Sequence, residues 1–74
     1  MYLVLRAAKI KNEHVPKLEL MLKSRLKAED VVIRKLHDRY FFSFKVDNSR
    51  KAFAFDKAVS NYGGTVAERW IQEI

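Results

Sequence analysis

Apolar residues at the start of the chain follow two different periods, which predict a strand followed by a helix. Residues 2–10 are apolar on both alternating faces, a pattern typical of a central strand in a sheet. Residues 14–28 carry apolar side chains at helical spacing, with lysines on the opposite side, and predict an amphipathic helix. We expect Asn12 to cap this helix and Pro16 to lie in its first turn.

The middle of the chain predicts a β-hairpin. Val31 begins a second strand, His37-Asp38 forms the turn, and residues 39–46 form a third strand with strict alternation. One face of the third strand should join the core, and the other should face away from it. The expected core positions are Tyr40, Phe42, Phe44 and Val46, and the outward positions are Arg39, Phe41, Ser43 and Lys45.

Residues 47–74 permit two interpretations. In the first, residues 47–49 cap a helix over residues 50–62, Gly63 ends it in a left-handed conformation, and residues 65–74 form a final strand. The result is a ferredoxin-like βαββαβ fold, with a four-stranded antiparallel sheet and two helices on one face.

In the second interpretation, residues 51–55 form a third hairpin strand, and a capping box at residues 65–68 opens a terminal helix. The fold is then βαβββα. We favour the first interpretation, because Gly-Gly followed by a β-prone segment is typical of a helix stop before a strand. The Ala-rich residues 52–58 also suit a helix better than an edge strand. Either way, residues 1–74 form a single small α+β domain.

Size and composition restrict the class of protein. Apolar residues make up 49% of the 74, which is enough for a folded core, although a domain this small has marginal stability. A homodimer would bury more surface. The chain contains no Cys, and no apolar run approaches the roughly 18 residues of a membrane span. We therefore expect a cytoplasmic protein without disulfides or membrane contact.

The positive charge is concentrated in the first part of the chain. Residues 1–45 hold eleven Lys and Arg against five acidic residues, which gives +6, whereas residues 46–74 hold four of each. The same first part contains the aromatic run 40–44. Positive charge attracts phosphate and aromatic rings stack on bases, so the combination is typical of a nucleic-acid-binding surface.

The predicted strands indicate where this surface would lie. If both helices cover one sheet face, the other face stays open and presents Phe41 among basic side chains. Such a surface resembles in composition the physical design of proteins that bind single-stranded RNA, although residues 39–46 do not match their consensus. The candidate nucleic-acid-binding residues are Arg6, Arg34, Lys35, Arg39, Phe41 and Lys45.

Catalytic and metal-binding patterns are missing from the sequence. His14 and His37 occupy a helix start and a turn, without a convincingly placed nucleophile. They also have no recognisable metal-ligand spacing with the neighbouring acids. Gly63-Gly64 suits a helix end better than a phosphate loop. We therefore expect no enzyme activity, no metal and no cofactor.

Two functions remain as expectations. The first is a small, basic, non-catalytic protein that binds nucleic acid, with single strands favoured by the exposed Phe41. The second is a protein-interaction module, such as an adaptor, subunit or inhibitor, whose basic surface binds an acidic partner.

Overall fold

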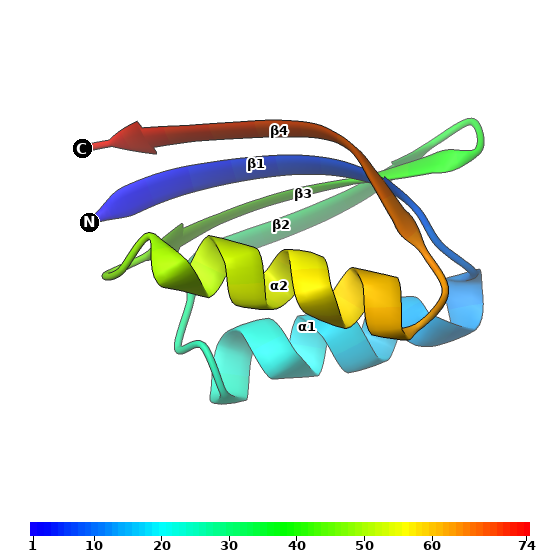
Figure 1. Cartoon of the computed structure of the whole chain (residues 1–74), viewed down its shortest axis with the longest axis horizontal. Helices are drawn as coiled ribbons and strands as arrows, with labels where there is room; N and C mark the ends of the chain where they lie inside the picture. The colour runs from blue at the N-terminus through cyan, green and yellow to red at the C-terminus, as the bar shows by residue number, and fades with distance from the viewer.

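The computed structural model describes all residues, 1–74, and has α+β architecture (Figure 1). The order of elements follows the first interpretation. The alternative βαβββα order is wrong, because residues 51–55 are helical and residues 65–73 form a strand. The elements are β1 (Tyr2–Lys9), the short 3₁₀ helix η1 (Asn12–His14), α1 (Val15–Ser24), β2 (Glu29–Leu36), β3 (Arg39–Val46), α2 (Arg50–Asn61) and β4 (Thr65–Glu73).

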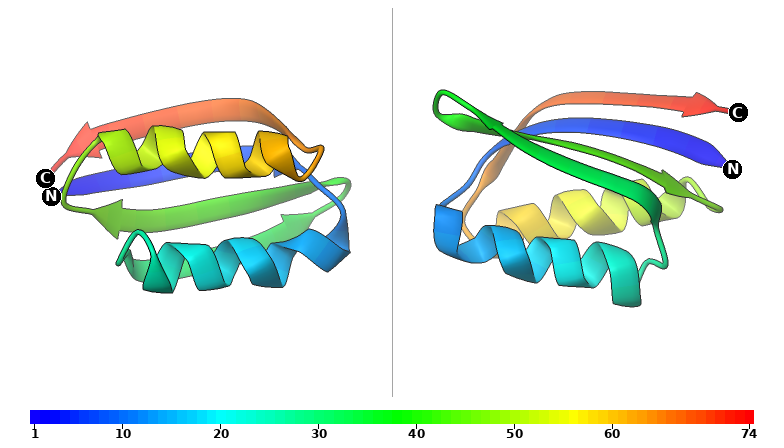
Figure 2. Two further views of the ribbon diagram at one scale, coloured as in Figure 1. Left: turned by 60° about the horizontal axis from the view of Figure 1, so that its bottom comes forward. Right: turned by 180° about the vertical axis from the view of Figure 1, so that it is seen from behind.

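The four strands form one antiparallel sheet in the order β2-β3-β1-β4. The predicted central position of β1 is therefore confirmed. Both helices lie against the same face of this sheet, and the opposite face carries no covering element (Figures 1 and 2). The two ends of the chain meet at the free ends of β1 and β4, where the Ile74 N–H donates to the Met1 carbonyl at 2.9 Å.

The core lies between the sheet and the two helices. The alternation predicted for β3 is confirmed at Phe42, Phe44 and Val46, which are fully buried, while Tyr40 is half-buried at the margin. Phe55 of α2 contacts both buried rings of β3, with ring centroids 4.9 Å from Phe42 and 5.2 Å from Phe44. The remaining buried members of the cluster are Val4, Ala8, Leu18, Leu22, Leu26, Ala52 and Val59.

The first helix is shorter than predicted, because it spans Val15–Ser24 whereas the sequence predicts residues 14–28. Asn12 does not cap it, because residues 12–14 form η1 and α1 starts only at Val15. The Asn12 side chain instead accepts hydrogen bonds from Lys35 Nζ, at 3.1 Å, and from the Tyr40 hydroxyl. It thus connects the loop after β1 to the β2–β3 hairpin.

The helices α1 and α2 span ten and twelve residues, and neither is long and apolar enough to cross a membrane.

The second helix has the predicted start and end. Asn48 Oδ1 accepts the Arg50 N–H at 2.8 Å, so the predicted cap at residues 47–49 is present. At the other end Gly63 has a φ of +80°, and the Gly64 N–H donates to the Val59 carbonyl at 2.9 Å. Gly63 thus provides the left-handed turn that the sequence predicted.

The two glycines should respond differently to substitution. A Cβ at Gly64 would lie 2.8 Å from the Lys9 carbonyl oxygen and 2.9 Å from a Val59 methyl, whereas Gly63 has open space around it. We expect Gly64→Ala to lower the free energy of unfolding by about 2 kcal/mol through overpacking. Gly63→Asn should cost less than about 1 kcal/mol, because Asn tolerates the left-handed conformation.

Urea denaturation followed by circular dichroism measures both variants. If Gly64→Ala is as stable as the unmodified protein, the close approach of β1 to the end of α2 does not exclude a side chain at position 64, and the prediction is wrong.

Candidate nucleic-acid interface

The sheet face opposite the helices is called the open face here. Strand alternation and pairing place sixteen side chains on it. They come from all four strands and include aromatic, aliphatic, basic and acidic groups. They are Leu3, Leu5, Ala7 and Lys9 of β1; Glu29, Val32, Arg34 and Leu36 of β2; Arg39, Phe41, Ser43 and Lys45 of β3; and Thr65, Glu68, Trp70 and Gln72 of β4.

Two neighbouring rows run across the centre of this face. In the first row, Phe41 pairs with Arg34 on one side and Ala7 on the other, and Ala7 pairs in turn with Glu68. The row therefore reads cation, aromatic ring, small residue, carboxylate, and it spans three strand spacings, or about 14 Å. The adjacent row consists of Val32, Ser43, Leu5 and Trp70.

A hollow of about 550 Å³ lies over these rows. Phe41 and Trp70 stand on either side of β1 and are 38% and 45% exposed, whereas Ala7 between their strands is only 2% exposed. The small Ala7 side chain keeps the surface over β1 low, so the hollow exists because a short residue stands between larger ones. Leu5, Ala7, Phe41, Glu68 and Trp70 are its open-face lining.

The unpaired basic side chains of the open face lie on one side of it. Arg34 is exposed and Arg39 is half-buried, and neither takes part in an ion pair. Lys45 is partly neutralised by Asp30, whose carboxylate lies 2.9 Å from its Nζ. All three belong to β2 or β3, where Glu29 lies opposite Lys45, while Glu68 stands on β4 at the other edge. The central row of the open face is therefore polarised, with the cation on β2 and the carboxylate on β4.

Four of the six residues predicted from the sequence share this face. Arg34, Arg39, Phe41 and Lys45 lie together on β2 and β3. Lys35 does not join them, because it follows Arg34 directly and so points to the other side of the strand. Its Nζ lies 5.6 Å from the centre of the Tyr40 ring and donates to Asn12.

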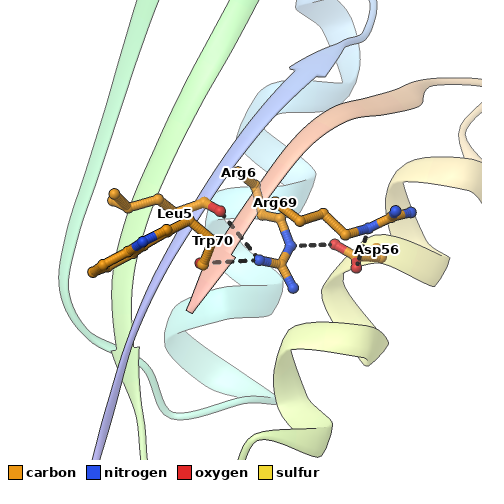
Figure 3. A network of polar contacts seen from close by, with 5 residues as sticks. All are labelled: Leu5, Arg6, Asp56, Arg69 and Trp70. Atoms are coloured by element: carbon orange, nitrogen blue, oxygen red, sulfur yellow. Dashed lines mark hydrogen bonds and ion pairs between the residues drawn. The ribbon is translucent and has the colours of Figure 1, made fainter. Parts of the chain in front are cut away.

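Arg6 also lies away from the open face, which corrects its expected placement. It is on the predicted central strand, but its side chain points to the helix side and is 3% exposed. Its Nε donates to Asp56 Oδ1 of α2 at 2.7 Å, and its Nη1 donates to the carbonyls of Leu5 and Trp70 at 3.1 and 3.2 Å (Figure 3). Arg69 Nε donates to the other Asp56 oxygen at 3.1 Å. Arg6 therefore ties α2 to β1 and β4.

Sequence reasoning did not identify Glu68 and Trp70 as members of the site. The pairing of β1 with β4 shifts between Ala7 and Ala8, so that Glu68 and Val66 oppose consecutive residues and Ala67 is extra. This bulge puts Val66 against the core and Glu68 and Trp70 on the open face, although all three are an even number of residues apart. No local feature of residues 65–74 signals the bulge.

The histidines lie outside the open face. His14 stacks on Tyr62 of the α2 C-terminal end with ring centroids 4.8 Å apart, and its Nδ1 is buried without a hydrogen-bond partner. His37 takes a φ of +59° in the predicted hairpin turn. The next residue, Asp38, accepts a hydrogen bond from its own backbone N–H and pairs with Lys9 at 3.4 Å, and both interactions lower its pKa. No group of three or more His, Asp or Glu comes together as a metal site.

Neither protein families nor curated proteins supply a function for this chain. No protein-family model matches it, and no curated protein matches it either. The geometry and charge of the open face are therefore the basis for assigning one.

The Arg6–Asp56 pair should be important for stability and not for binding. Replacing Asp56 with Ala leaves the buried guanidinium of Arg6 without its carboxylate partner, and we expect the free energy of unfolding to fall by about 3 kcal/mol. Arg69→Ala should cost less than about 1 kcal/mol, because the Arg69 side chain is 60% exposed.

Chemical denaturation provides the measurement, with the exposed neighbour Lys57→Ala as the matched control on the same helix. An Asp56→Ala protein as stable as this control would contradict the structural role given to Arg6.

Proposed function

We propose that the protein is a small, non-catalytic nucleic-acid-binding protein with a ferredoxin-like βαββαβ fold. It binds single strands on the open face. The observation that carries the proposal is the row in which the unpaired Arg34 stands beside the exposed Phe41, with the exposed Trp70 in the adjacent row beyond β1. A cation beside exposed rings on an uncovered sheet suits a phosphate followed by a stacked base.

The shape of the face favours single strands over duplexes. Stacking on Phe41 or Trp70 requires a base whose faces are accessible, and bases inside a duplex are stacked on one another. The rings themselves are accessible because the sheet lacks a cover on this side (Figure 2). Each stacked base contributes about 1–3 kcal/mol in proteins of this kind, with little dependence on sequence.

The number of basic side chains sets the expected salt dependence. Arg34 and Arg39 are unpaired, and Lys45 shares its charge with Asp30. Two to three phosphate contacts on a single strand give a slope of log K against log salt of about −2. Such a surface would bind moderately and release its ligand readily at higher salt.

A second candidate is favoured by the apolar content of the same face. Large apolar side chains are exposed on all four strands there, and such a patch is typical of protein contacts. An acidic protein would complement Arg34 and Arg39, and a second copy of the chain would cover the apolar residues. The exposed members are Leu5, Val32, Leu36, Phe41 and Trp70.

Fluorescence of Trp70 tests the first candidate directly. It is the one tryptophan of the chain and lies on the open face, so a base that stacks beside it should quench its emission. We expect single-stranded oligonucleotides to quench it at micromolar concentration, with the salt slope given above. Phe41→Ala should weaken binding about tenfold or more through loss of stacking.

Arg34→Glu and Lys57→Glu form a matched pair for the charge. Both change the net charge equally, but Lys57 lies on α2, away from the open face. Arg34→Glu should weaken binding much more than Lys57→Glu. Equal effects of the two substitutions would show that nucleic acid binds elsewhere on the protein. The second candidate would be favoured if oligonucleotides do not quench Trp70 and the protein instead forms a concentration-dependent dimer or a complex with an acidic protein.

A further inference from the structure

The hollow on the open face contains an acidic group that phosphate binding does not explain. Glu68 lines the hollow opposite Ala7 and makes no hydrogen bond or ion pair within the protein. We propose that the hollow holds one base of the bound strand and that Glu68 selects bases that present hydrogen-bond donors. This inference rests on the proposed function and adds base preference to it.

The polarity of the face fixes how a nucleotide would lie. Glu68 repels phosphate, whereas Arg34 at the other end of the same row attracts it. A nucleotide therefore lies across the strands, with its phosphate over β2 and the edge of its base toward β4. The ring of Phe41 comes between these two positions and is where the base would stack.

The lining of the hollow fits a flat apolar group. Its floor is Ala7, the smallest side chain of the two central rows, and its walls include Phe41 and Trp70. The volume of about 550 Å³ is in the range of sites that hold small organic ligands. A base that enters over Ala7 meets apolar surface on both sides. Among the open-face side chains that line the hollow, the one polar group is the Glu68 carboxylate.

The chemistry of a carboxylate determines which bases it accepts. An ionised carboxylate has two acceptor oxygens and no donor. Guanine presents two adjacent donors, N1–H and the N2 amino group, so one carboxylate can accept from both. Adenine and cytosine each present one amino group, while uracil presents a single N–H between two carbonyl oxygens that the carboxylate repels. The expected order of preference is guanine first, adenine and cytosine next, and uracil last.

Binding of short oligouridylates with one central substitution tests this order. Trp70 fluorescence and the anisotropy of a labelled strand report binding of the all-U strand and of strands with a single G, A or C. We expect the strand with G to bind about fivefold more tightly than the all-U strand. Glu68→Gln should bind the all-U strand more tightly and lose most of this preference, since it removes both the repulsion and the paired acceptors.

Glu73→Gln is the matched control, because it makes the same charge change on the same strand. Position 73 pairs with Tyr2, on the helix side of β1. The inference is overturned if the four strands bind equally, or if Glu68→Gln and Glu73→Gln change all four affinities alike; binding to single strands would then stand without base preference. If none of the strands binds, the proposed function fails and this inference fails with it.

Discussion

Contact of Phe55 with both Phe42 and Phe44 is the interaction on which the arrangement of this small domain depends. It holds α2 across the centre of the sheet, and Leu18 and Leu22 of α1 complete the same cluster. Both helices therefore pack against the same face of the sheet, and no helix remains to cover the other. Because successive side chains of a strand point to opposite sides, burying Phe42 and Phe44 obliges Phe41 and Ser43 to face solvent.

The order of the strands converts the uneven distribution of charge along the sequence into an uneven distribution of charge across the sheet surface. The basic first part of the chain supplies β1, β2 and β3, and the neutral second part supplies β4. Since β2 and β4 are at opposite edges, unpaired arginines gather on one side of the open face and Glu68 stands on the other. A ligand with one charged and one apolar end would bind such a face in one orientation.

Features decided by neighbouring residues could be predicted from the sequence, and features decided by distant contacts could not. The alternation of β3 and the stop at Gly63 are local, so both were correct. Arg6 was misplaced because its partner Asp56 lies fifty residues away and gives no local sign. Trp70 and Glu68 were missed because the bulge at Ala67 reverses the alternation after Val66 and depends on how β4 pairs with β1.

The bulge at Ala67 also affects how copies of the molecule meet. β4 forms one edge of the sheet, and a straight edge strand offers a row of free N–H and C=O groups to any other extended chain. The extra residue twists this edge and interrupts its hydrogen-bonding register, and the charged Glu68 and Arg69 follow the interruption. The irregularity that brings Trp70 to the surface therefore also protects the exposed backbone from edge-to-edge aggregation.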